Sequence, residues 1–451
     1  MGRMNTKLKL ISAIVACQVS MANADAFSET LSNSLFKAPQ VVEAINAYQA
    51  SIHAIEQAKS GYKPKVDMTL GYGYEWTKDA TDDELNRREA RLNLSQMLYD
   101  GGATGSEVDR QDAKSRSAYA HLSDVADDYL LEAGRAYLEL LRRQQLRDSA
   151  AATLANHQKL FDQIKRRAEM GVGAESSVNQ AQGRLSLAEV NSLVAENNYL
   201  DALATYERVL GQPAPTEVSP VPAQIGVMPK TVQEGLELLR TQHPVMAVAS
   251  ADLEASLAQR EAAKAKYQPR VHFEVERRWD HNLDGSAGAN EDLTAMVRLR
   301  WNLYNGGADE AWEANTIKQI GQAQAVQDDA LLQANQSLKL SWNAYTVLGK
   351  QIGFLADHLK ASRDTRDAYQ KQFDINQRTL LDLLDTENEV FTAQNQLVDA
   401  QTDHQIAQLR VLNSIGGLAG ALDITINPDS LPTEEDPGVA VTETVQESPA
   451  S

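Results

Sequence analysis

The sequence predicts an α+β membrane protein in which long coiled-coil helices join β-hairpins long enough to cross a bilayer. Three observations carry this prediction. The motif LYDGG at residues 98–102 returns as LYNGG at residues 303–307, an offset of 205 residues. Each copy follows an alternating apolar and polar segment that reads as a β-strand. A proline-free stretch of about 65 residues follows the first copy, which favours a very long helix.

Length and charge bound the possible partners. The chain has 451 residues, too many for one compact core, so two units of about 200 residues are expected. Its net charge is −19, which argues against a nucleic-acid partner, because phosphate binding needs a basic face. Aromatic residues make up only 6%, a composition that suits long helices with close seams better than a globular enzyme.

Residues 1–26 read as a secretory signal peptide. A basic start is followed by an apolar segment, and ANADA at 22–26 offers small-x-small cleavage sites. The only cysteine is Cys17, within this segment, and IVAC at 14–17 loosely resembles a lipoprotein cleavage box. We expect cleavage after Ala24 or Ala26, with lipidation at Cys17 as the alternative. A cleaved chain would contain no disulfide.

The offset of 205 residues recurs along the chain, which indicates a tandem duplication. APQVV at 38–42 corresponds to HPVMA at 243–247, and GYKPKVDM at 61–68 corresponds to KYQPRVHF at 266–273. The predicted organisation is a first repeat over 27–211, a proline-rich linker over 212–230 and a second repeat over 231–424. Residues 425–451 form an acidic tail that we expect to be disordered.

Each repeat is expected to contain a hairpin between two helical segments. Pro64 and Pro269 end a helix and begin a strand, because proline clashes inside a helix. The first strand of repeat one has an apolar face opposite a polar one, and in repeat two only Arg277 interrupts the apolar face. The apolar positions of the four strands are Val66, Met68, Leu70, Tyr72, Tyr74 and Trp76, then Leu92, Leu94 and Leu98, then Val271, Phe273, Val275 and Trp279, then Val297, Leu299, Trp301 and Leu303.

Glycine pairs end the second strand of each hairpin. Gly101 and Gly102 in repeat one correspond to Gly306 and Gly307 in repeat two, and glycine lets the backbone bend there. The residue before each pair, Asp or Asn, can cap the next helix. Val66 to Trp76 has the length that crosses a bilayer as a β-strand. Four strands are too few to close a barrel and open edges are not tolerated in lipid, so several chains must share one.

The second long helix of each repeat shows a heptad pattern, which predicts left-handed supercoiling, and alanine at alternate positions predicts close helix approach. The predicted seams are Val178, Ala181, Leu185, Ala188, Ser192, Ala195, Tyr199, Ala202 and Tyr206, and Leu383, Thr386, Val390, Ala393, Leu397, Ala400, His404, Ala407 and Val411.

This arrangement resembles the TolC-type outer-membrane efflux and secretion proteins. The resemblance rests on the doubled hairpins flanked by Pro and Gly-Gly, on MGVGAESSVNQA at 170–181 and on FDINQRTLLDLLDTENEV at 373–390, and covers about 27–424. It implies a homotrimer with a shared twelve-strand transmembrane barrel, four strands per chain, in the outer membrane of a Gram-negative cell. It also implies a helical tunnel that crosses the periplasm. RTLLDLLDTENE looks most like the branch for type I secretion of adhesins.

The resemblance also implies partners. A periplasmic adaptor protein would dock on the two interhelical turns, and an inner-membrane ABC transporter would drive export. In the efflux alternative, the transporter would be a proton-driven pump. The family usually has Val-Gly in both turns, and here Asn376 replaces the second glycine; asparagine tolerates the left-handed conformation. The docking residues would be Met170, Gly171 and Val172, with Ile375, Asn376 and Gln377.

The resemblance further places a constriction at the inner tip of the tunnel. Asp382 and Asp385 fall on the family's aspartate rings, and their spacing of three puts them on one helix face. Phe373 falls where a gate tyrosine is common, and Arg378 where a gate arginine sits. The usual partners of that arginine map to Ser176 and Ser177. The alternative for both aspartates is an ordinary solvated helix end.

Three functions remain to be compared: a passive export channel for protein or small molecules, a periplasmic coiled-coil scaffold, and an enzyme. Strands of membrane-crossing length favour the channel. The sequence contains no G-x-S-x-G, P-loop, G-x-G-x-x-G or H-E-x-x-H motif, and no histidine pair spaced for a metal. We therefore expect no catalytic residues and no cofactor.

Overall fold

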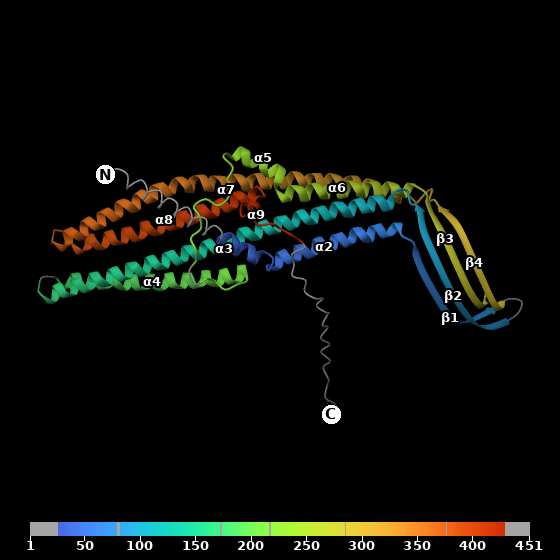
Figure 1. Cartoon of the computed structure of the whole chain (residues 1–451), viewed down its shortest axis with the longest axis horizontal. Coiled ribbons are helices and arrows are strands. Elements are labelled where there is room, and N and C mark those ends of the chain that lie inside the picture. The colour runs from blue at the N-terminus through green and yellow to red at the C-terminus, as the bar shows by residue number, and fades with distance from the viewer. Residues whose placement is uncertain are drawn as a thin grey trace, which may run out of the picture.

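The computed structural model describes residues 26–78, 82–171, 174–215, 218–284, 286–375 and 377–428. The chain forms an elongated bundle of helices with a four-stranded sheet at one end (Figure 1). Residues 1–25 and 429–451, which hold nearly all of the predicted signal peptide, Cys17 and most of the acidic tail, lie outside the described residues. Residues 26–35 are helical and precede the elements of repeat one. These elements are α2 Pro39–Lys59, the short 3-10 helix η1 Ser60–Tyr62, β1 Lys65–Lys78, β2 Asp82–Tyr99, α3 Ala103–Glu169 and α4 Glu175–Leu210.

The second repeat reproduces the first at the predicted offset. Its 67-residue helix begins and ends 205 positions after its counterpart in repeat one, and the helices before both hairpins also match residue for residue. The predicted duplication is therefore confirmed as a structural repeat. The elements of repeat two are α5 Val232–Gln242, α6 Pro244–Lys264, η2 Ala265–Tyr267, β3 Arg270–Leu283, β4 Ser286–Arg300, α7 Ala308–Asp374, α8 Leu380–Ser414 and α9 Leu418–Ala421.

The long helices pack as two antiparallel pairs. Helix α3 packs on α4, α7 packs on α8, and α3 also packs on α8, so the four helices follow the order α7, α8, α3, α4 (Figure 1). At about 1.5 Å per residue, α3 and α7 are each roughly 100 Å long. Every predicted heptad position of α4 and α8 is buried or half-buried, so both predicted seams are confirmed. Among the helices of the described residues, none has a segment long and apolar enough to cross a membrane.

The main core lies near the middle of the bundle. There the helix over 26–35 meets α3 and the ends of α4 and α8, and the linker closes over them. Phe27 lies edge-on to Tyr137, with ring centroids 5.0 Å apart, and Tyr206 lies 6.2 Å from Tyr137. The large, fully buried side chains of this core include Leu31, Leu35, Leu130, Leu138, Tyr206, Leu210, Leu239 and Leu338.

The proline-rich linker follows the surface of the bundle as an ordered strap. Val218, Val221 and Ile225 are buried in the main core. Gln408 of α8 donates to the Ala223 carbonyl at 2.8 Å and accepts from the Ile225 N–H at 2.9 Å. These bonds satisfy backbone groups that have no secondary structure of their own, which fixes the linker against the second repeat.

The four strands form one antiparallel sheet in the order β1-β2-β3-β4. Strand β2 links the repeats, because its last residues pair with the start of β3, as in Gln96 opposite Phe273 and Tyr99 opposite Val271. Residues 301–304 correspond to 96–99 but are not a strand, although the sequence predicted apolar strand positions there. In the described part of the chain, β3 begins opposite Arg300, so these four residues have no strand beside them.

Two aspartates of α3 sit in surroundings that disfavour their charge. Burial, together with the charge of Asp128, raises the pKa of Asp124 to about 6. Burial also raises the pKa of Asp127 to about 6, although its Oδ1 accepts from the Ala419 N–H at 2.9 Å. A folded-state pKa above the ordinary value means that the folded chain prefers the neutral acid. This contribution to stability is complete at low pH and is lost as the pH rises through about 6.

We therefore expect Asp124→Asn to stabilise the folded protein at neutral pH and to have little effect near pH 4. Thermal unfolding midpoints of the detergent-solubilised protein, measured from pH 4 to pH 8, test this. The gain should appear mainly between pH 4 and pH 6. Asp109→Asn, at an exposed position of the same helix, is the control. A gain that does not depend on pH would exclude titration as its cause.

Candidate membrane-facing sheet and tunnel entrance

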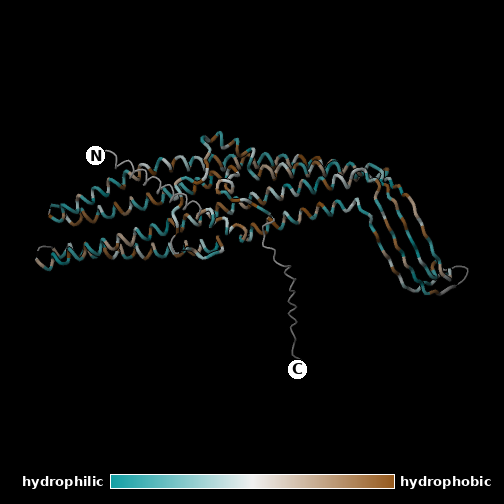
Figure 2. The backbone as a smooth tube through the Cα atoms, viewed as in Figure 1, coloured by the Kyte–Doolittle hydropathy of each residue, from teal (hydrophilic) through white to brown (hydrophobic). Residues whose placement is uncertain are grey.

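One face of the sheet is apolar and uncovered. On β1 the apolar residues are exposed by 61% at Val66, 68% at Leu70 and 64% at Trp76. The register places Val66, Leu94, Val275 and Ala295 in one row across all four strands. The alternation of apolar and polar residues is visible along each strand in Figure 2. An exposed apolar surface spread over a whole sheet indicates a lipid or protein environment.

Arg277 interrupts this apolar face, and the structure gives it a partner. The sequence suggested that its side chain would extend toward a rim. Instead, its Nη2 donates to Glu291 Oε2 at 2.7 Å, and its guanidinium lies 5.4 Å from the centroid of the Trp279 ring. Glu291 lies opposite Trp279 and therefore on the same face. A neutralising partner lowers the cost of a charge on an apolar surface.

The opposite face of the sheet is polar and carries charges of both signs. Arg87 bonds Glu75 at 3.1 Å and Glu89 at 3.0 Å. Arg298 bonds Glu274 at 2.7 Å. Charged side chains on one face and apolar ones on the other are the pattern of a strand that separates lipid from a water-filled space.

The predicted strand–helix junctions are confirmed. Pro64 and Pro269 directly precede β1 and β3. Gly101 and Gly102 have φ values of 75° and 87°, and Gly306 and Gly307 have 59° and 83°. A Cβ at Gly101 would lie 2.4 Å from the Cβ of Gln268, whereas one at Gly306 would meet no atom within 4 Å among the described residues. The first junction is therefore packed against the second repeat, and the equivalent second junction is open.

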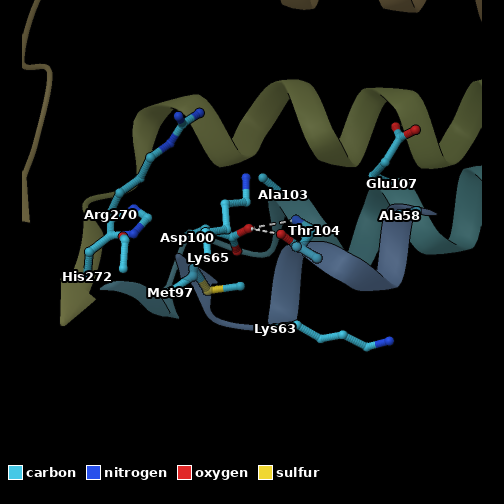
Figure 3. Close-up of a pocket in the computed structure, with 12 residues that line it drawn as sticks. Ala58, Lys63, Lys65, Met97, Asp100, Ala103, Thr104, Glu107, Arg270 and His272 are labelled. Atoms are coloured by element: carbon cyan, nitrogen blue, oxygen red, sulfur yellow. Dashed lines mark hydrogen bonds between the residues drawn. The ribbon is translucent and has the colours of Figure 1, made fainter. Parts of the chain in front are cut away.

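Asp100 caps α3, whereas Asn305 does not cap α7. Asp100 Oδ2 accepts from the N–H and the hydroxyl of Thr104 at 2.7 and 2.5 Å, as Figure 3 shows, and Oδ1 accepts from the Gly102 N–H. Burial opposes ionisation of Asp100, but these hydrogen bonds outweigh it and lower the pKa. The Asn305 side chain instead donates to Asp309 at 3.4 Å. Capping by the residue before the glycines thus holds for repeat one only.

The interhelical turns form the far end of the bundle. Helix α3 ends at Glu169, and Gly171 takes φ 75°. Met170 and Ile375 are exposed, and the Gln377 N–H bonds the Gln372 carbonyl at 2.8 Å. Val172 and Asn376, the other two predicted docking residues, lie outside the described residues. The described turn residues therefore present apolar side chains to solvent at the tip.

Asp382 caps its own helix. The Thr379 hydroxyl accepts from the Asp382 N–H, and the Asp382 carboxylate accepts from the Thr379 N–H and hydroxyl, which completes a capping box. The bonds from Thr379, with the nearby charge of Arg378, hold the pKa of Asp382 below its ordinary value. This is the environment of one chain. A rise caused by carboxylates of neighbouring chains remains a prediction about the assembly.

Asp385 links the two helical pairs. Its Oδ1 accepts from Arg184 Nη2 of α4 at 3.0 Å, with both side chains more than a third exposed. An exposed ion pair of this kind contributes little to stability, on the order of 0–1 kcal/mol. Asp385 is therefore accessible at the surface of the chain, one turn along α8 from the capping box.

The other predicted gate residues do not all meet. Arg378 Nε bonds Gln372 at 3.0 Å, and its guanidinium lies 4.2 Å from the centroid of the Tyr369 ring and 3.8 Å from Asp382. Among the described residues, Arg378 makes no hydrogen bond or ion pair with Ser176 or Ser177, which lie at the start of α4. Within one chain, the arginine therefore closes the second turn rather than joining the two turns.

Phe373 is buried, so its ring packs rather than lines an opening in this structure. It belongs to a small core with Leu160, Leu380 and Leu383, and the Arg167 guanidinium lies 5.1 Å from its ring centroid. Sequence reasoning missed the partner residues Arg184, Tyr369 and Arg167. It also missed Thr379, whose spacing of three before Asp382 is a capping-box signature that could have been found.

Comparisons with known proteins agree with this geometry. The outer membrane efflux protein family matches residues 30–212 and 235–417, one match for each repeat. The chain is 24% identical to the outer membrane efflux protein BepC of Brucella suis, over 90% of this chain and 89% of that protein. It is 22% identical to the outer membrane protein TolC of Vibrio cholerae, over 91% and 96%. It is 20% identical to the alkaline protease secretion protein AprF of Pseudomonas aeruginosa, over 83% and 80%.

Solved structures share the fold. A structure of CusC superposes with a TM-score of 0.76 at 15% identity, covering 87% of this chain and 92% of that chain. The outer membrane protein VceC from Vibrio cholerae superposes with a TM-score of 0.74 at 17% identity, covering 87% and 96%. With both repeats matched and an apolar sheet joined to a long helical bundle, the chain belongs to the outer membrane efflux protein family and is a Gram-negative outer-membrane channel protein that extends into the periplasm.

Proposed function

We propose that three copies of this chain close one twelve-strand barrel and one helical tunnel, which together form the outer-membrane exit of a tripartite export system. The observation that carries this proposal is the sheet, which has an exposed apolar face and two unpaired edges, β1 and β4. Unpaired backbone N–H and C=O groups are very costly in lipid, so both edges need partners there. A second copy of the same chain offers the complementary edges.

The repeat specifies how a second copy would pair. Within the chain, the second strand of repeat one pairs with the first strand of repeat two, with Leu94 opposite Val275. Applying the offset of 205 residues moves this pair to Leu299 of one copy and Leu70 of the next. The same operation gives residues 301–304 a partner strand, which explains why β4 ends at Arg300 in a single chain.

Two cavities at the sheet–helix junction support the same arrangement. The first, about 440 Å³, has Lys65, Asp100 and Thr104 on one side and Arg270 and His272 of the next repeat on the other (Figure 3). The second is lined by the positions that follow these by 205 residues, namely Arg270, Asn305 and Asp309. Its remaining wall would come from Lys65 and Asp67 of a second copy. The open site at Gly306 fits the same neighbour.

The number of copies follows from closure and from the family resemblance. Four strands cannot form a barrel, since about eight is the minimum. We propose three copies, as the resemblance implies. Each would contribute one four-strand sheet and two helical pairs.

At the tunnel tip, the proposal assigns the entrance to Asp382 and Asp385. Three chains would bring six carboxylates together, with Arg378 holding the second turn closed. The periplasmic adaptor would dock on the exposed tips around Met170 and Ile375, with Gly171, Val172, Asn376 and Gln377. The inner-membrane partner would be an ABC transporter.

We propose type I protein secretion as the more specific role. It is supported by RTLLDLLDTENE at 378–389, which resembles the adhesin secretion branch, and one relative is a protease secretion protein by name. Export of small molecules by a proton-driven pump is the second candidate, because another relative is an efflux protein by name. A soluble coiled-coil scaffold fits less well, since it would leave the apolar face of the sheet in water.

We expect oxidation of Leu299→Cys with Leu70→Cys to link chains into covalent dimers and trimers in native outer membranes, because the predicted register brings these side chains together across two chains. Non-reducing electrophoresis gives the readout. Leu299→Cys with Tyr74→Cys is the matched control, with the same strands and face but about 13 Å out of register. Equal cross-linking of both pairs, or of neither, would contradict the proposed register.

We expect Asp382→Asn with Asp385→Asn to weaken block by trivalent cations added from the periplasmic side and to reduce cation selectivity. Six carboxylates around one opening attract and hold multivalent cations, and the amides do not. Purified trimers in planar bilayers give both measurements. The double variant retains both side-chain volumes, so helix and trimer should persist. Block as strong as in the parent protein would place these residues away from the constriction.

We expect a deletion strain to lose surface display of a large secreted protein and to keep its resistance to drugs and detergents, because the 378–389 motif points to the secretion branch. Immunoblots of surface protein and drug sensitivity measured on the same strain give the answer. Complementation with the parent gene is the control. Drug sensitivity with normal surface protein would favour the efflux role.

A further inference from the structure

The two outer helices of each chain, α4 and α7, carry exposed apolar stripes. On α7, Leu340, Val347 and Phe354 recur at intervals of seven and are exposed by 56%, 62% and 77%. On α4, Val190 and Val194 are exposed by 53% and 54%, and Leu187 and Leu193 are exposed as well. Within the chain, α7 packs on α8 and α4 on α3, so both stripes point away from these contacts.

The seam between the two helical pairs inside one chain is different in kind. Along this α3–α8 seam, Arg142 Nη1 donates to Asp403 Oδ1 at 3.0 Å and lies 3.7 Å from Asp399. One turn pair further toward the tip, Ser149 Oγ donates to Asn395 Oδ1 at 3.1 Å. The lower part of the α3–α8 seam is therefore joined through polar contacts.

The repeat relates these two surfaces. The offset of 205 residues carries Arg142 to Val347 and Asp399 to Val194. If a second copy packs α4 on α7 as α8 packs on α3, these two valines face each other across the chains. Each member of the ion pair is thus replaced by a valine.

The next contact toward the tip follows the same rule. Ser149 corresponds to Phe354 and Asn395 to Val190. The exposed stripes are therefore the positions that the repeat would place in contact. A register derived from the polar seam brings apolar residues together on both sides, which a chance distribution of surface residues would not do.

We propose that the α4 and α7 stripes form an apolar seam between neighbouring chains, in this register, and that the polar α3–α8 seam is the one that separates when the tunnel widens. The inference rests on the proposed assembly of several copies. Charged and hydrogen-bonding groups exchange their partners for water when they separate, whereas separated apolar side chains only gain contact with water. The contacts between chains therefore hold while each chain opens between its own helical pairs.

Disulfide locks test the register. Phe354→Cys with Val190→Cys should link chains into trimers on oxidation, and Ser149→Cys with Asn395→Cys should form a bond within one chain. The control is Phe354→Cys with Leu193→Cys, because Leu193 lies on another side of α4. Absence of the Phe354–Val190 link in a protein that still forms the Leu299–Leu70 link overturns the seam and leaves the proposed function standing. Absence of both links removes the shared assembly itself.

The same locks test which seam opens. Conductance of purified trimers in planar bilayers is recorded for each locked variant before and after reduction. The lock across α3–α8 should suppress large conductance events, and reductant should restore them, whereas the lock between chains should leave them unchanged. Equal effects of the two locks, including no effect of either, overturn the proposal.

Discussion

The backbone hydrogen bonds at the two edges of the sheet are the constraint on which the rest of the structure depends. Strands β1 and β4 each offer a row of amide and carbonyl groups along one side, next to a face covered with apolar side chains. In water such edges are tolerable, but in hydrocarbon each unsatisfied group is expensive. The apolar face and the open edges can therefore be satisfied together only by closure with further strands. The rest of the chain, including the helical bundle, is built in the same repeated units that closure requires.

Much of the fold could be predicted from the sequence because the determinants are local or periodic. Proline before β1 and β3, glycine pairs after β2 and β4, and heptads along α4 and α8 act through backbone geometry and side-chain spacing, which a single sequence reveals. The duplication allows each pattern to be checked against its copy. The end of β4 was not predictable in this way, because residues 301–304 have the right alternation but lack a neighbouring strand.

The entrance was harder to predict because its contacts join residues distant in sequence. The ion pair of Asp385 with Arg184 spans about two hundred positions, and no local pattern signals it. Arg378 contacts Tyr369 and Gln372 on its own helical pair instead of the serines expected from the resemblance. Phe373 is held in a core by helices of both repeats. Side-chain partners of this kind depend on how two helical pairs are placed relative to each other, which propensity and periodicity do not determine.

The linker that joins the repeats also bears on the order of assembly. Its buried valines and the bonds from Gln405 and Gln408 hold it against α8, so the two halves of a chain are tied together over a short path. Pairing of β2 with β3 is then a unimolecular step at a high effective concentration, whereas pairing of β4 with another chain is bimolecular and follows the amount of protein present. One of the two kinds of repeat junction thus forms by chain connectivity alone. The other makes the stability of the finished channel depend on the concentration of chains.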